Sequence, residues 1–193
     1  MRIPACYACR IALLLVVLLL ICMSSAAPTG ARAASGSFHV YLPLLARAAQ
    51  PSIEQQVTDL TNEQRQQHGC ADALVLSAQL TAAASAHSQD MALHDLFSHT
   101  GSNGSTMVSR ALATGYSYSL LAENLAAGAS TAEEVMTGWM SSAGHRANIL
   151  NCDLHELGVG FYAQLDDQAN VQLGNGQLGG PFRYYWTQDF GSR

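Results

Sequence analysis

The chain has 193 residues, of which 49% are hydrophobic, so it can form one domain with a sizeable core, and extensive disorder is excluded. It contains nine arginines, no lysine and 14 acidic residues, for a formal net charge of −5. Beyond residue 33, six arginines remain against 14 acids, a net charge of −8, which argues against nucleic acid or an anionic membrane surface as a partner.

The N-terminal segment is predicted to be a secretory signal peptide. Arg2 and Arg10 supply its positive start, residues 11–21 are an unbroken apolar run, and small residues follow at 24–27. The apolar run is shorter than the roughly 20 residues that a membrane-spanning helix needs. We therefore expect residues 1–33 to be removed and the protein to be secreted, with an uncleaved N-terminal anchor as the alternative.

A linker is predicted over residues 34–51, where alanine, serine, glycine and glutamine are frequent and Pro51 closes the segment. Within it, residues 38–45 (FHVYLPLL) form an apolar patch that is consistent with an extended segment docking on the domain or on a partner. The folded domain is expected over residues 52–193, without a membrane-spanning segment and as a monomer.

Two cysteines, Cys70 and Cys152, lie beyond the predicted signal peptide. A pair of cysteines in an exported protein favours one disulfide, which would stabilise the domain by about 3–5 kcal/mol because it closes a loop of roughly 80 residues. A metal-binding role for the pair is weak, since neither cysteine belongs to a C-x-x-C arrangement.

Helices are predicted in the first two thirds of the domain from capping residues and apolar periodicity. Ser52 begins the first and Gly69 ends it. His87 falls on the buried stripe of the second helix and is interpreted as a hydrogen-bonded core histidine, and Glu134 as a cap of the fourth helix. The segments are residues 53–68, 77–94, 106–112 and from 131 onward.

The pattern changes after Cys152. Residues 159–165 alternate between apolar and polar or glycine positions, and residues 184–190 are rich in aromatic residues and threonine. Turn residues lie between these two predicted strands. Helices followed by hairpin strands, without alternating β-α-β units, predict an α+β fold with an antiparallel sheet.

Three polar residues are candidates for chemistry: His99, Glu123 and His145, each expected in a loop or at the edge of an element. Glu123 interrupts an apolar stretch, and a buried carboxylate requires a partner, for which an imidazole is well suited. Two histidines and a carboxylate can bind zinc with an open fourth position or act as general acid and base. The same residues can also form a purely structural polar network.

Seven short sequences together resemble the CAP superfamily of cysteine-rich secretory, antigen 5 and pathogenesis-related proteins (SCP domain), in its bacterial form. They occur in the family's order across about residues 53–191. The matching sequences are LTNEQR (60–65), AHSQDMA (86–92), FSH (97–99), ENLA (123–126), WMSSAGHRANIL (139–150), GVG (158–160) and YWTQDFG (185–191).

The resemblance implies an α-β-α sandwich with a cleft lined by two histidines and two glutamates. His99, Glu123 and His145 match three of these positions, whereas Ser142 stands at the fourth, three residues after the tryptophan. A serine replaces a carboxylate poorly as a ligand or a base, so the resemblance implies weak binding of a divalent metal such as zinc at His99 and His145, and no robust hydrolysis.

Three functions remain open for such a protein. The first is an extracellular binding module that takes a small apolar ligand, a lipid, a sterol or a cell-envelope component. The second is a metal-dependent hydrolase or protease, and the third is a structural interaction protein at the cell surface. Fold resemblance alone does not choose among them.

Overall fold

The computed structural model describes residues 50–193, so the predicted signal peptide (1–33), nearly all of the linker (34–51) and the apolar segment 38–45 lie outside it. The elements are α1 (Ile53–Gln67), β1 (Val75–Leu76), α2 (Ala78–Leu93), β2 (Leu96–Phe97), α3 (Met107–Ala113), β3 (Leu120–Ala127), α4 (Ala132–Ser141), α5 (Ala143–Ile149), β4 (Glu156–Ala163), β5 (Val171–Leu173), β6 (Leu178–Gly179) and β7 (Tyr184–Ser192).

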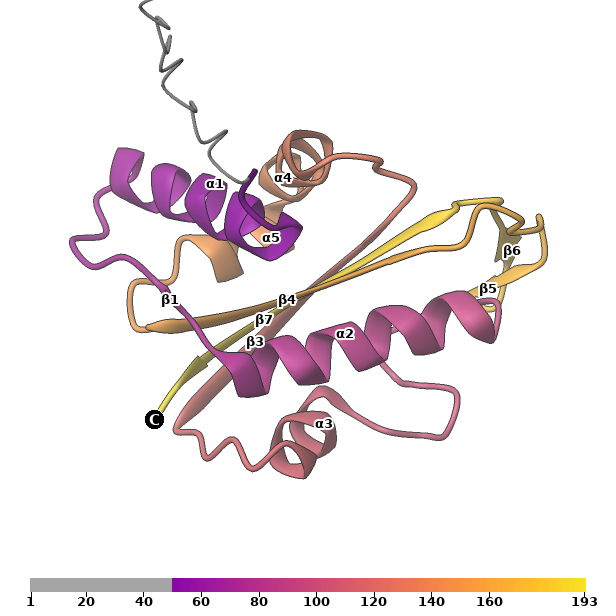
Figure 1. The fold of residues 1–193 in the computed structure, drawn as a ribbon, viewed down its shortest axis with the longest axis horizontal. Helices are drawn as coiled ribbons and strands as arrows, with labels where there is room; N and C mark the ends of the chain where they lie inside the picture. Colours follow the sequence, from indigo (N-terminus) through magenta and orange to yellow (C-terminus); the bar gives the residue numbers. More distant parts are fainter. Residues whose placement is uncertain (1–49) are drawn as a thin grey trace, which may run out of the picture. The chain divides into compact units, whose positions relative to one another are not determined.

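Helices cover both faces of a central sheet whose strand order is β1-β4-β7-β3 (Figure 1). On one face, α1, α4 and α5 contribute Val57, Trp139 and Ile149 to a buried cluster that includes Trp186 and Phe190 of β7. On the other face lie α2 and α3. A small second sheet, β2-β5-β6, lies beside the end of α2. The predicted α-β-α sandwich is confirmed.

The predicted antiparallel sheet needs one correction. β3, β7 and β4 are antiparallel neighbours, but the short edge strand β1 runs parallel to β4, so the sheet is mixed. Two residues are too few to show an alternating pattern, and for this reason the sequence does not predict β1. The predicted position of Glu123 is also corrected, because this residue lies inside the eight-residue strand β3, not in a loop or at an element edge.

The predicted helix caps are confirmed. The Ser52 hydroxyl accepts a hydrogen bond from the backbone N–H of Gln55 at the start of α1. Thr131 caps α4, and the Glu134 carboxylate accepts hydrogen bonds from the N–H and hydroxyl of Ser130. His87 is fully buried in α2 and contacts the carbonyl oxygen of Ser98 through Nε2 at 3.0 Å, as expected of a core histidine.

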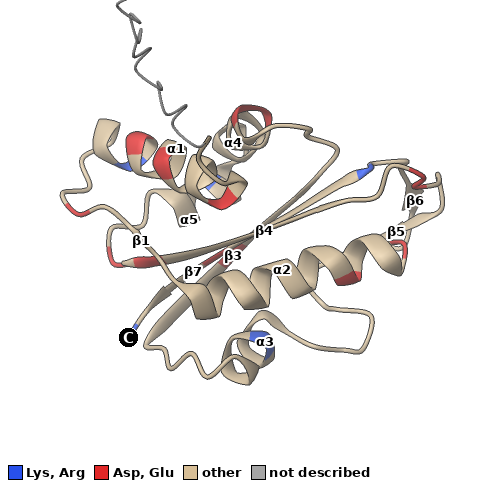
Figure 2. Ribbon diagram, viewed as in Figure 1, with Lys and Arg blue, Asp and Glu red and all other residues tan. Residues whose placement is uncertain are grey.

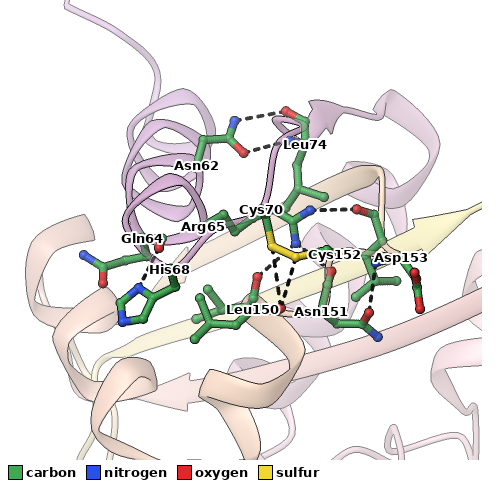
Figure 3. Close-up of a disulfide and its surroundings, with 12 residues drawn as sticks. Asn62, Gln64, Arg65, His68, Cys70, Leu74, Leu150, Asn151, Cys152 and Asp153 are labelled. Atoms are coloured by element: carbon green, nitrogen blue, oxygen red, sulfur yellow. Dashed lines mark hydrogen bonds between the residues drawn. A yellow bond between two sulfur atoms is a disulfide. The ribbon is translucent and has the colours of Figure 1, made fainter.

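The Cys70–Cys152 disulfide is present, with the two Cα atoms 5.3 Å apart (Figure 3). It joins the end of α1 to the segment that follows α5. Beside it, the Asn62 amide makes two hydrogen bonds to the backbone of Leu74, and Arg65 donates to carbonyl groups near the end of α5. The disulfide and the Arg65 hydrogen bonds connect α1 to the end of α5, and the Asn62 hydrogen bonds connect α1 to the segment before β1.

The disulfide gives a first testable prediction for the two cysteines of the domain. Cys70 and Cys152 are expected to be oxidised, so alkylation under native and denaturing conditions without reductant should add no label to the mature chain. Mass spectrometry before and after reduction measures this, with the gain of two labels after reduction as the positive control. Two alkylatable thiols in the unreduced protein would contradict the prediction.

Candidate functional site

The candidate site is built around the carboxylate of Glu123 on the edge strand β3. Its side chain is only 3% exposed, and both oxygens are engaged. Oε1 lies 2.7 Å from Nδ1 of His99, which follows β2, and Oε2 lies 2.6 Å from an Nη of Arg110 in α3. The Glu123 carboxylate therefore connects β3 both to the segment that follows β2 and to helix α3.

Opposing influences set the ionisation of Glu123. Burial by itself would raise the pKa of this carboxyl group, but the hydrogen bond from His99 and the positive charge of Arg110 outweigh it and hold the pKa below its usual range. Glu123 is thus a carboxylate at neutral pH. It accepts from both neighbours, so the proton of a neutral His99 ring lies on Nδ1.

Arg110 also fixes the backbone of His99. Its side chain is 8% exposed, and its guanidinium group donates hydrogen bonds to the carbonyl oxygens of His99 and Ser105. Because the backbone and Nδ1 of His99 are both held, its Nε2 is the ring nitrogen that remains free for a ligand. The His99 side chain is 63% exposed, in keeping with that role.

His145 comes from the opposite helical layer. It lies in α5, not in a loop as expected, and its carbonyl oxygen accepts a hydrogen bond from the Asn124 amide of β3. Asn148, one turn further along α5, donates to the carbonyl of Glu123 and to the side chain of Asn124. Burial first, and the nearby His99 second, lower the pKa of His145, so its ring is neutral at pH 7.

His99 and His145 line one cavity of about 610 Å³, next to the edge of the sheet. Its other walls come mainly from apolar residues of β3 and of the region around β2, β5 and the segment before β7. Within residues 50–193, the complete lining is Phe97, Ser98, His99, Leu125, His145, Leu173, Gly174, Asn175 and Phe182.

The two remaining predicted site residues, Glu123 and Ser142, are not part of the cavity lining. Glu123 lies behind His99. Ser142 connects α4 to α5, where its backbone N–H donates to Trp139, and it is not part of the lining just given. Contact between Ser142 and a ligand stays a prediction.

Arg110 and Asp189 were not among the residues predicted for the site. Arg110 is an arginine within the mostly apolar helix α3 (MVSRALA), a signal comparable to the one that singled out Glu123. Asp189 is the residue paired with Glu123 across β3 and β7, and it is 1% exposed. The sequence feature that could have identified Asp189 is an acidic residue within an otherwise buried strand, YYWTQDFGS.

A metal bound here would have two protein ligands. No group of three or more histidine, cysteine, aspartate or glutamate residues in the part of the chain from residue 50 onward is arranged to hold a metal ion, and both oxygens of Glu123 are already engaged. Zinc binding at His99 and His145 stays a prediction. A carboxylate that accepts a hydrogen bond from the second nitrogen of a ligating histidine fixes the orientation of the ring, as Glu123 does for His99.

Weak zinc binding is expected, and its affinity should fall as the pH is lowered, because imidazoles must be neutral to act as ligands. Calorimetric titration of the wild type and of His145→Ala measures it, and His155→Ala, whose side chain is exposed outside the cavity, is the matched control. The His145→Ala variant should lose binding while the control retains it. Equal binding by all three proteins would refute the assignment.

Comparison with known proteins supports the pattern of motifs. Residues 58–190 match the family model described as CAP, the cysteine-rich secretory protein family. The Bacillus subtilis protein YkwD is 38% identical over 110 residues, which cover 57% of this chain and 42% of YkwD. The Bacillus subtilis membrane protein YlbC is 33% identical over 119 residues, covering 60% of this chain and 34% of YlbC. The chain thus spans less than half of either curated relative.

Solved structures show the same arrangement of helices and strands. An extracellular protein with an SCP domain from Bacillus anthracis superposes with a TM-score of 0.60 at 31% identity, over 72% of this chain and 40% of that one. An outer surface protein from Borrelia burgdorferi has a TM-score of 0.54 at 18% identity, over 74% of this chain and 96% of its own, and shows the fold alone.

Proposed function

Because the chain belongs to the CAP family of cysteine-rich secretory proteins, we propose that it is an extracellular binding module whose cleft takes a small, uncharged and largely apolar ligand. The observation that carries this proposal is the cavity of about 610 Å³ that holds His99 and His145 against an apolar wall. A volume of that size is typical of sites for small molecules, which bind mainly through apolar contacts and a few well-placed polar groups.

The apolar wall supplies most of the surface that a ligand would cover. Phe97 and Phe182 lie with their ring centroids 6.1 Å apart, and Leu125 and Leu173 also line the cavity. Phe97 and Phe182 pack against the buried cluster that contains Leu125, so this wall is preformed. Covering it would release the water in contact with these side chains and provide the main driving force for binding.

The polar end of the cavity favours an uncharged group. Among the lining residues found within 50–193 there is no arginine, aspartate or glutamate, and His145 is neutral at pH 7. Acidic residues lie on α1 and α4, in the same helical layer as α5 (Figure 2). An anionic ligand would lack a cationic partner, whereas a hydroxyl or carbonyl group can hydrogen-bond to the imidazoles or to Asn175.

An extracellular location is part of the same proposal. The Bacillus anthracis neighbour is described as extracellular and the Borrelia protein as an outer surface protein. None of the helices between residues 50 and 193 has the length and hydropathy required to cross a bilayer. Residues 1–33 would act as the export signal, with residues 34–51 linking it to the domain.

Titration with the uncharged dye Nile red, whose fluorescence increases in apolar surroundings, tests the cleft. The wild type should give saturable enhancement, and Leu173→Gln should weaken binding by roughly tenfold, the equivalent of losing about 1.4 kcal/mol of apolar burial.

The matched control is Leu165→Gln, which changes a leucine that is 68% exposed and lies outside the cavity lining. It should bind the dye like the wild type. The cleft is not the binding site if both variants bind equally well, and the proposal fails if the wild type gives no saturable signal.

A further inference from the structure

Asp189 stands out among the buried ionisable groups because neither of its carboxylate oxygens has a hydrogen-bond donor within residues 50–193. It is 1% exposed, in the middle of β7. A buried carboxylate without a donor is strongly unfavourable, so this group must either gain a partner or be uncharged.

The register of the sheet identifies the partner. Asp189 is directly opposite Glu123 in the antiparallel pair of β7 and β3, which places the two side chains next to each other on the same face of the sheet. On its other flank Asp189 is opposite Gly158, which has no side chain and lies against the backbone of Leu80 in α2. Glu123 is therefore the side chain next to Asp189 in the sheet.

The charges around the pair decide which group carries a proton. Arg110 bonds to Glu123, His99 and Ser105 and makes no hydrogen bond to Asp189. His87 of α2 is kept neutral because burial, and then the charge of Arg110, lower its pKa. Two carboxylates with one guanidinium cannot both remain charged in a buried site. Glu123 already has two donors, so Asp189 is the group that retains the proton.

We propose that Asp189 is a positioning residue of the cleft: its neutral carboxyl group donates a hydrogen bond to Glu123 and holds that carboxylate beneath His99. Burial and the charge of Glu123 both raise the pKa of Asp189 well above its usual range, in keeping with this assignment. Glu123 then accepts from three groups, and the protonated Nδ1 of His99 leaves Nε2 directed to a ligand. This role rests on the proposed function and deepens it, since Asp189 orients one of the two cleft imidazoles.

The test uses NMR on the mature, disulfide-bonded protein without ligand, so its result is separate from that of the dye titration. The ¹³C signal of the Asp189 carboxyl group, assigned by its loss in Asp189→Asn, should have the chemical shift of a protonated acid at pH 7. The ¹⁵N signals of His99 should show the Nδ1–H tautomer. An ionised Asp189 at pH 7 would overturn the proposal.

Variants separate positioning from a general loss of stability. Asp189→Asn retains a donor and should preserve the His99 tautomer, whereas Asp189→Leu removes the donor and should give a mixture of tautomers. Thr187→Val is the control, because it removes the buried Ser88–Thr187 hydrogen bond two residues away on the same face and should leave His99 unchanged. If Asp189→Leu does not fold, the Asp189→Asn variant alone tests the proposal. A changed His99 tautomer in that variant would refute it.

Discussion

Replacing Arg65 by methionine is expected to lower the free energy of unfolding by about 4–6 kcal/mol, because hydrogen bonds from a charged donor contribute roughly 1.5–3 kcal/mol each. Arg65 is 1% exposed, and its guanidinium donates to the carbonyl oxygens of Ile149, Asn151 and Leu154 at 2.7–3.0 Å. These carbonyls lie at and beyond the end of α5, where the helix leaves its own acceptors unpaired and where a positive charge is favourable. Methionine fills similar space but donates to none of them.

The measurement is urea unfolding of oxidised Arg65→Met, with the free energy extrapolated to water. Arg146→Met is the matched control, since the Arg146 guanidinium is exposed and donates to a single carbonyl, that of Met140 at 2.8 Å. The control should lose less than about 1 kcal/mol. Equal, small losses in both variants would show that Arg65 is not the main connection between α1 and the end of α5.

Replacing Gly160 by alanine is expected to cost about 3–5 kcal/mol, because overpacking against rigid backbone cannot be relieved by a side-chain rotation. A Cβ at Gly160 would overlap the carbonyl group of Ala84, and one at Gly158 would overlap the backbone of Leu80. Both contacts are with the backbone of α2, so the whole helix would have to move away from β4. That shift would also disturb the buried Ser88–Thr187 hydrogen bond across the same interface.

Gly138→Ala in α4 is the matched control for this prediction. Nothing lies within 4 Å of a Cβ at Gly138, which is exposed, so alanine should stabilise the helix by up to about 1 kcal/mol. Opposite signs for Gly160→Ala and Gly138→Ala in thermal or urea unfolding are the expected result. A loss at Gly160 below about 1 kcal/mol would mean that α2 packs less closely on β4 than the structure shows.

The parts of the fold that were predicted correctly are those with strong local signals. Ser52 and Thr131 carry capping hydroxyls, Gly69 adopts a positive φ beyond α1, and β7 is rich in aromatic residues. These features are decided within a few residues of the chain, and their interpretation did not require knowledge of the tertiary contacts.

The parts that were missed depend on distant partners. β3 (LLAENLAA) contains no β-branched residue, and it forms a strand because β7 pairs along its whole length. α5 is a seven-residue helix that is held by hydrogen bonds to distant parts of the chain. Arg65 of α1 donates to its last residue, and Asn148 of α5 donates to Asn124 of β3. Short elements of this kind obtain their stability from packing and not from local propensity.

For the candidate site, the sequence motifs supplied His99, Glu123 and His145 but not the groups behind them. Arg110 and Asp189 reach Glu123 from a different helix and a different strand. No spacing rule connects these positions, because the pairing of β3 with β7 and the docking of α3 bring them together. The apolar wall formed by Phe97 and Phe182 was missed for the same reason, since the two phenylalanines are distant in sequence.

The most direct test of the ligand cleft is ¹⁵N NMR of the histidine rings during titration with dodecanol, an uncharged amphiphile. We predict saturable shifts of the His99 and His145 ring signals, while those of His94 and His155, which do not line the cavity, remain unchanged. Unchanged His99 and His145 signals at dodecanol concentrations that saturate the protein, or shifts confined to His94 or His155, would contradict this assignment of the cleft.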